Sequence, residues 1–163
     1  MNHSAREWIE RLGLVPLAEG GWFKLRVRSG IALPEGAAGC GGERDSCSCI
    51  YYLLSKDEIS RWHRLCASEV WTWHAGGSLL MTLGGDGELP QAGKTQTLGP
   101  RLERGEEFSV LAPAGQWQTS YVEDGEFVLV SCVVSPAYDD ADCLLPENPL
   151  PNEIYPQGGG KDT

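Results

Sequence analysis

Residues 62–76 have the sequence WHRLCASEVWTWHAG, and this stretch decides how the rest of the chain is interpreted. It holds two of the three histidines and three of the six tryptophans, together with Arg64 and Glu69. Groups that can carry a proton thus stand among large aromatic side chains, a combination typical of a small-molecule pocket. We expect two short strands here, over 61–66 and 69–74, with a turn between them.

Further short strands are expected on both sides of this stretch. Upstream, Phe23, Leu25 and Val27 alternate with basic residues, which predicts a half-buried strand. The acidic run at 123–126 is a hairpin signal. The strands predicted outside 61–74 cover 22–28, 49–54, 79–84, 95–98, 107–111, 117–123 and 127–135.

One short helix is expected near the N-terminus. Ser4 and Glu7 have the spacing of a capping box, and Gly13 follows the last apolar position of the helical period. A single helix followed by many short strands predicts an all-β sandwich or barrel.

Length and composition indicate one domain with a tail. The 163 residues are enough for one domain, which we place at 1–145, and the Pro- and Gly-rich residues 146–163 are expected to be extended or disordered. The net charge of −10 disfavours a nucleic-acid partner. Neither a membrane-spanning run nor a signal-peptide pattern is present, so we expect a cytosolic protein without a membrane partner.

The six cysteines, at 40, 47, 49, 66, 132 and 143, are expected to be thiols in a reducing compartment. Their spacing matches no zinc finger. Residues 29–46 carry no period and are expected to form a loop long enough to cover a site. Asp139, Asp140 and Asp142 are expected to lie in a solvated turn or strand end.

The order of several motifs resembles the cupin type 5 family over roughly residues 5–145. The resemblance implies a jelly-roll barrel, usually dimeric, similar in shape to dTDP-sugar 3,5-epimerases and to seed storage proteins, in a family whose biochemical role is largely undefined. The motifs that carry it are Glu19-Gly20-Gly21-Trp22-Phe23, Ile50-Tyr51-Tyr52-Leu53-Leu54, Trp62-His63-Arg64, Glu69-Val70-Trp71, His74-Ala75-Gly76 and Pro113-Ala114-Gly115-Gln116-Trp117.

Two positions depart from the metal-binding pattern of cupins. The resemblance implies four ligands, of which His63 and Glu69 are present, while Leu65 and Gln118 stand at the other two. Transition metals need three or more good donors. Strict alternation puts His74 on the strand face opposite Glu69. We therefore expect no stoichiometric metal and no cofactor.

The same residues suit acid–base chemistry without a metal. We predict a small polar ligand, carbohydrate-like, in the barrel, possible turnover by an epimerase or isomerase mechanism, and a homodimer. His63 would be the base, Glu69 its partner and Tyr51 the acid. Candidate ligand contacts are Trp71, Trp73, His74, Gln116, Trp117, Gln118 and Tyr121, and the resemblance adds Glu19. A metal-dependent enzyme using His63 and Glu69, and a non-catalytic binding module, are the alternatives.

The face of the 61–66 strand gives one geometric expectation. Leu65 should point inward, so His63, two residues earlier, should share its face. A buried imidazole needs a polar partner, and Glu69 or a tyrosine is expected to supply it.

Overall fold

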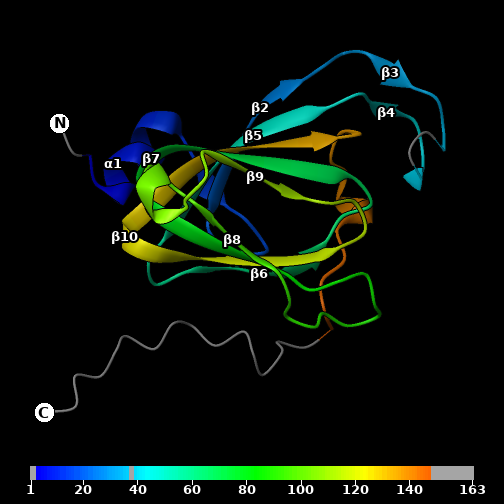
Figure 1. The fold of residues 1–163 in the computed structure, drawn as a ribbon. Helices are drawn as coiled ribbons and strands as arrows, with labels where there is room; N and C mark the ends of the chain where they lie inside the picture. Colours follow the sequence, from blue (N-terminus) through cyan, green and yellow to red (C-terminus); the bar gives the residue numbers. More distant parts are fainter. Residues whose placement is uncertain (1–2, 37–38, 148–163) are drawn as a thin grey trace, which may run out of the picture.

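The computed structural model describes residues 3–36 and 39–147, and these form an antiparallel β-barrel with one helix at its side (Figure 1). The main sheet has the order β1-β2-β5-β10-β7-β8, while β6 pairs with β10 and β9 pairs with β7. The strands are β1 (Val15–Pro16), β2 (Trp22–Arg28), β5 (Ser48–Ser55), β6 (Ile59–Arg64), β7 (Ser68–Leu83), β8 (Thr95–Leu98), β9 (Ser109–Ala112) and β10 (Trp117–Ser135).

Two long strands, β7 and β10, hold the barrel together. They pair antiparallel from Gln118 opposite Leu83 to Ser135 opposite Ser68. The first part of β10 also pairs with β6, and its later part pairs with β5. The two strands therefore belong to both layers of the barrel, which explains how a few elements enclose one interior (Figure 1).

The bend in this ribbon depends on glycine. A Cβ at Gly77 would lie 1.7 Å from the carbonyl oxygen of Asp124, and one at Gly76 would lie 2.1 Å from that of Phe127. Register shifts flank Asp124 in the pairing of β10 with β7. The hairpin predicted at 123–126 is therefore wrong, as is the division of β7 into two strands. The chain bends at these bulges and continues in the same strand.

The N-terminal helix α1 (Ala5–Leu12) has the predicted ends. The Ser4 side chain accepts from the backbone N–H of Glu7, the Glu7 carboxylate accepts from the backbone of Ser4, and Gly13 ends the helix at φ 64°. Trp8, Ile9 and Leu12 pack against the outer face of the sheet, on a cluster formed by Leu14, Leu53, Phe127 and Leu129. This covering explains why β5 is apolar on both of its faces.

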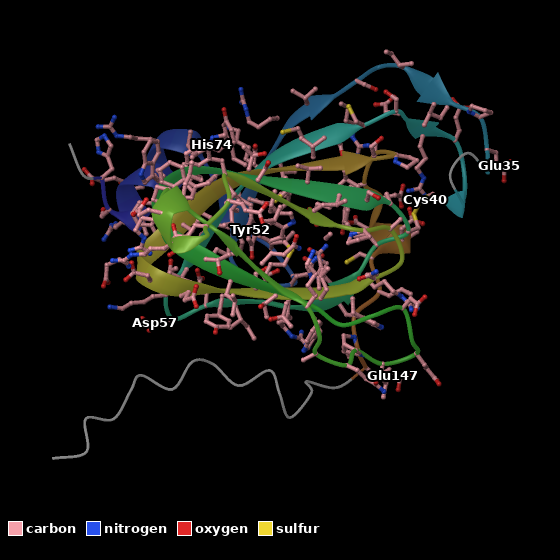
Figure 2. All side chains as sticks on the ribbon, viewed as in Figure 1. Glu35, Cys40, Tyr52, Asp57, His74 and Glu147 are labelled. Atoms are coloured by element: carbon pink, nitrogen blue, oxygen red, sulfur yellow. A yellow bond between two sulfur atoms is a disulfide. The ribbon has the colours of Figure 1, made fainter. Side chains whose placement is uncertain are left out.

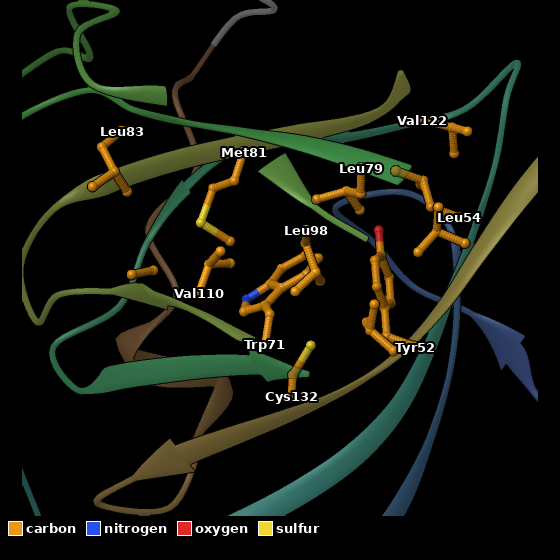
Figure 3. Packing of buried hydrophobic residues seen from close by; sticks show 13 residues of the cluster. Tyr52, Leu54, Trp71, Leu79, Met81, Leu83, Leu98, Val110, Val122 and Cys132 are labelled. Atoms are coloured by element: carbon orange, nitrogen blue, oxygen red, sulfur yellow. The ribbon is translucent and has the colours of Figure 1, made fainter. Parts of the chain in front are cut away.

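Apolar side chains pack together in the barrel interior, among them Leu79, Met81, Leu98 and Val122 (Figure 3). Tyr52 and Trp71 lie within the same cluster, with their ring centroids 5.3 Å apart in an edge-to-face arrangement. Burying each such side chain stabilises the fold by about 1.5–3 kcal/mol. The core thus fixes the positions of the rings that border the cavity described below.

The segment 29–46 is more ordered than a plain loop. Its described part holds a two-stranded ribbon, β3 (Ala32–Leu33) with β4 (Arg44–Asp45), which projects from one end of the barrel (Figure 1). Cys40 is joined to Cys66 by a disulfide, so the prediction of free thiols is wrong for this pair. Cys47, Cys49, Cys132 and Cys143 are free.

The acidic cluster lies in a turn, as predicted, but is not simply solvated. Asp139 caps the 3₁₀ helix η3 (Asp140–Asp142), and Asp142 pairs with Arg44 of the ribbon. A second 3₁₀ helix, η2 (Leu102–Arg104), follows β8. The predicted tail falls almost wholly on 148–163, outside the described residues. Within the described part of the chain, no helix has the length and apolar character needed to cross a membrane.

Candidate functional site

A cavity of about 70 Å³ lies inside the barrel, bordered by Tyr52, Trp71 and Cys132 of the apolar cluster. It is lined by the turn before β2, by five strands and by the segment after β10. The lining residues are Leu17, Glu19, Phe23, Ser48, Ile50, Tyr52, Ser60, His63, Leu65, Glu69, Trp71, Cys132, Val134 and Tyr138. Most are apolar or aromatic, and a few polar groups converge among them, as in small-molecule sites.

A larger, open groove of about 750 Å³ lies beside α1. Lys56 and Glu126, two of its charged residues, are paired with each other. We place the candidate site in the barrel, where Glu19, His63 and Glu69 are buried around one cavity and Glu19 Oε2 has no partner.

The turn at 19–21 places the Glu19 carboxyl group in the cavity. Gly20 and Gly21 have φ values of 108° and 74°, which favour glycine. A Cβ at Gly20 would lie 2.1 Å from the Ile59 carbonyl oxygen. The backbone N–H of Arg61 donates to the Glu19 carbonyl at 2.7 Å. The turn is therefore fixed to β6 closely enough to hold Glu19 inside.

The Glu19 carboxylate is buried, with 5% of the residue exposed. Its Oε1 accepts from the Cys143 thiol at 3.0 Å, and its Oε2 has no partner. Burial, followed by the contact with Glu19, raises the pKa of the Cys143 thiol, so the thiol remains protonated and can donate.

His63 lies inside the barrel beside Leu65, as alternation predicts. Its Nδ1 is 2.8 Å from the carbonyl oxygen of Arg61. Because a carbonyl only accepts, Nδ1 must carry the proton, and in the neutral ring Nε2 holds the lone pair. The polar partner is thus a backbone carbonyl, and the expectation that Glu69 or a tyrosine would fill this role is wrong.

Glu69 contacts Gln118. The Gln118 amide donates through Nε2 to Glu69 Oε2 at 2.7 Å, and both residues are buried. Gln118 is also paired with His63 through the strand register of β10 and β6. The three residues predicted around the cupin metal position are therefore adjacent. Cys132 lies nearby, and burial, followed by the charge of Glu69, raises the pKa of its thiol.

The donors around His63 do not fit the metal that the cupin resemblance implies. The Gln118 amide directs its N–H at Glu69, and an N–H donor cannot ligate, while the remaining atom, Oε1, is an amide oxygen and a weak ligand for transition metals. Among the described residues, the only three His, Cys, Asp or Glu groups with ligand atoms within 4.8 Å of one another are Cys40, Cys66 and Asp142. Two of these are joined in the disulfide.

Tyr52, not Tyr51, is the tyrosine of β5 that lines the cavity. Its hydroxyl donates to the Gly20 carbonyl at 2.8 Å, and burial raises its pKa well above the usual value. Tyr51 lies on the other face of β5, where it meets His74 edge-to-face and Arg26 lies over its ring. The assignment of Tyr51 as the acid is therefore wrong in position.

His74 is exposed on the outside of the barrel, whereas Tyr52 lies between the layers (Figure 2). Of the other predicted ligand contacts, some line the cavity and others point elsewhere. Trp71 lines the cavity, but Trp73 packs on the core and its indole donates to the Gly77 carbonyl. Trp117 donates to the Gly87 carbonyl on the opposite face of β10 from Gln118. Gln116 and Tyr121 are half-buried and do not line the cavity.

The cavity-lining residues that sequence reasoning missed include Ser48, Ser60, Cys132 and Tyr138. Cys132 shares a face with Val134 by simple alternation, so its inward position could have been predicted. Ser60 lies inside together with His63 because of a register shift between β6 and β10, for which the sequence carries no signal.

A family model described as Cupin superfamily (DUF985) matches residues 6–145. Among solved structures, a hypothetical protein from Leishmania major is 32% identical with a TM-score of 0.78, and the match covers 87% of this chain and 86% of that one. Protein SO0799 from Shewanella oneidensis is 35% identical with a TM-score of 0.76, over 88% and 84%.

A third structure, KdgF from Halomonas sp., shares the fold at 13% identity and a TM-score of 0.50, over 78% of this chain and 89% of that one. No curated protein matches the chain.

Proposed function

Because the chain belongs to the cupin superfamily, in the family described as DUF985, we propose that it binds a small, polar, carbohydrate-like ligand in the barrel and epimerises or isomerises it without a metal. One observation carries this proposal. His63 is buried and fixed through Nδ1, and it lines the same cavity as Glu19, Glu69 and Tyr52. A base, carboxylates and a phenol around one small space are what such a reaction needs.

The proposed reaction is a proton transfer at a carbon next to a carbonyl. His63 Nε2 takes the proton from that carbon, and the electron pair of the C–H bond moves into the carbonyl to give an enolate. Tyr52 then turns its hydroxyl from the Gly20 carbonyl and returns a proton to the opposite face of the same carbon. His63 then loses its proton to water and Tyr52 regains one, so nothing is consumed. The raised pKa of Tyr52 keeps the phenol protonated until that step.

The cavity wall supports a carbohydrate-like ligand. Phe23, Tyr52, Trp71 and Tyr138 supply flat apolar surfaces, on which the C–H faces of a sugar can pack. Glu19 and Glu69 supply acceptors for hydroxyl groups. The combination allows a ligand that is polar at its edges and apolar on its faces.

Deuterium exchange tests the reaction. Unphosphorylated aldoses and ketoses are incubated with the protein in D₂O, and loss of the C–H signal next to the carbonyl is followed by proton NMR. We expect exchange with at least one sugar, slowed about 100-fold or more in His63→Asn. His74→Asn is the matched control, because His74 is exposed on the outer face, and it should exchange normally. Normal exchange by His63→Asn would contradict the proposal.

One observation favours a non-catalytic binding module as the second candidate. Glu69 accepts from Gln118, and the ring of His63 is held by a backbone carbonyl, so no carboxylate orients the proposed base. Binding of sugars to the cavity with no exchange of any of them would support this candidate over the enzyme.

A further inference from the structure

The described residues that line the cavity include two buried carboxylates and no permanent cation. Glu19 and Glu69 both line it, with 5% and 6% of each residue exposed. Among the lining residues that the structure describes, none is Lys or Arg. Buried carboxylates are ordinarily paired with a cation, because taking a charge out of water is costly. The described side chains that line the cavity therefore offer no cation to either carboxylate.

The donors that do reach the carboxylates are neutral. Glu69 Oε2 accepts from the Gln118 amide, and Glu19 Oε1 accepts from the Cys143 thiol, which is a weak donor. Glu19 Oε2 is buried without any partner. Buried oxygens usually accept a hydrogen bond, and a donor group on a ligand in the cavity would supply one to Glu19 Oε2.

We propose that the cavity selects ligands with a protonated amine beside their hydroxyl groups and holds the amine at Glu19. Ligands with a carboxylate or phosphate are rejected. This inference rests on the function proposed above. The ammonium would donate to Glu19 Oε2 and compensate the buried charge. The aromatic residues Phe23, Tyr52, Trp71 and Tyr138 border the same space, and aromatic faces attract cations. Amino sugars and amino alcohols form this chemical class.

An anionic ligand would be repelled by the carboxylates of this cavity. Its charge would join those of Glu19 and Glu69 in a space where screening by water is weak. Sites for carboxylates and phosphates usually present arginine, lysine or a helix N-terminus, and none of these lines the cavity in the described part of the chain. Sugar acids and sugar phosphates are therefore disfavoured by the same residues that favour amines.

The test compares probes that differ only in charge. Glucosamine, glucose and glucuronate form one series, and 2-aminopropane-1,3-diol, glycerol and glycerate form a smaller one, chosen because the cavity is small. Binding is measured by saturation-transfer NMR and titration at a pH of about 6.5, where the amines are protonated. We expect the amine of at least one series to bind about tenfold more tightly than its neutral analogue, with no measurable binding of the anion.

Two variants connect this preference to Glu19. Glu19→Gln keeps the shape of the side chain and should remove the preference for the amine while leaving the neutral probe bound. Glu103→Gln, an exposed carboxylate of η2 outside the cavity, should leave the preference unchanged. Circular dichroism and melting curves check that both variants fold.

The inference is overturned if an anion binds as tightly as its amine, if no probe binds at millimolar concentration, or if the preference survives in Glu19→Gln. Exchange with a neutral or anionic sugar that His63→Asn abolishes would leave the proposed reaction standing even if the charge preference fails. Amine binding without any exchange would support the charge preference and count against the reaction.

Discussion

The Gln118 amide donates to the Glu69 carboxylate at 2.7 Å, although Gln118 pairs with Leu83 and Glu69 with Val134 in the ladder of β10 and β7. In a metal-binding cupin the corresponding side chains would both point their lone pairs at an ion. Here Gln118 donates an N–H, and this hydrogen bond holds the Glu69 carboxylate. Glutamine at this position thus gives a hydrogen-bonded pair with Glu69.

We predict that the purified protein holds less than about one-tenth of an equivalent of transition metal, because His63 and Glu69 lack further donors. Elemental analysis after purification without chelator measures this. Gln118→His combined with Leu65→His would restore four donors and should raise zinc retention to about one equivalent. About one equivalent of zinc, iron, manganese or nickel in the unmodified protein would contradict the prediction.

Local sequence signals were enough to predict the ends of α1 and the inward position of His63. The ends of α1 follow from Ser4, Glu7 and Gly13, which act on neighbouring backbone groups. The inward face of His63 follows from its spacing to Leu65. In each case the determining contacts lie within a few residues of each other, so the sequence carries the information.

Other features depend on contacts that the sequence does not display. Tyr51 and Tyr52 stand in a strand that is apolar on both faces because α1 covers the outer one, so alternation cannot distinguish them. The acidic run at 123–126 has hairpin composition, yet the close approach of Asp124 to Gly77 makes it a bend. The partner of Cys40 lies 26 residues away and is set by the path of a segment without periodicity.

Gly20→Ala should destabilise the protein by about 2 kcal/mol or more, because its Cβ would meet the Ile59 carbonyl at 2.1 Å and φ is 108°. It should also weaken ligand binding, since Glu19 is held by the same turn. Gly30→Ala is the control. Its φ is 68° with nothing within 4 Å, so it should cost about 1 kcal/mol and leave binding intact. The free energy of unfolding is measured in urea. Equal losses of this free energy in the two variants would show that the close approach of Gly20 to Ile59 is unimportant.

The disulfide predicts how many thiols react before and after reduction. Thiol titration of the unfolded, unreduced protein should find the four free cysteines, and prior reduction should raise the number to six. Because Cys40 and Cys66 are 26 residues apart, replacing both with serine should lower the free energy of unfolding by about 3–4 kcal/mol through loop entropy. Six reactive thiols without reductant would mean that the bond does not form in solution.

We predict a homodimer that pairs through β2. In the described chain, β1 covers only Trp22 and Phe23, while Leu25 and Val27 are 46% and 50% exposed on an open edge. Light scattering should give twice the chain mass of 17.7 kDa. Val27→Glu should shift the mass toward the monomer, whereas Leu102→Glu, equally exposed on η2, should not. A monomer at all micromolar concentrations would refute this.

The last prediction concerns Arg101, whose side chain joins three groups. Its Nε donates to Glu106 Oε1 at 2.8 Å, one terminal nitrogen donates to Ser78 at 2.6 Å, and the other contacts Asp124. Burial would raise the pKa of Glu106, but the hydrogen bonds from Arg101 outweigh it and hold the pKa below its usual value. The hydrogen bond from Arg101 likewise lowers the pKa of Asp124.

A carboxyl with a lowered pKa in the folded state stabilises the protein above the pH where the unfolded chain titrates, about 4 for these side chains. This stabilisation disappears as the pH falls through the folded-state pKa. Arg101→Met should therefore lower the urea midpoint at neutral pH, and its difference from the unmodified protein should shrink as the pH falls below about 4. Arg6→Met, which removes a fully exposed pair on α1, should change the midpoint little at either pH. Tryptophan fluorescence follows unfolding in all three proteins, and a difference between Arg101→Met and the unmodified chain that stays constant with pH would show that the carboxyl groups do not depend on Arg101.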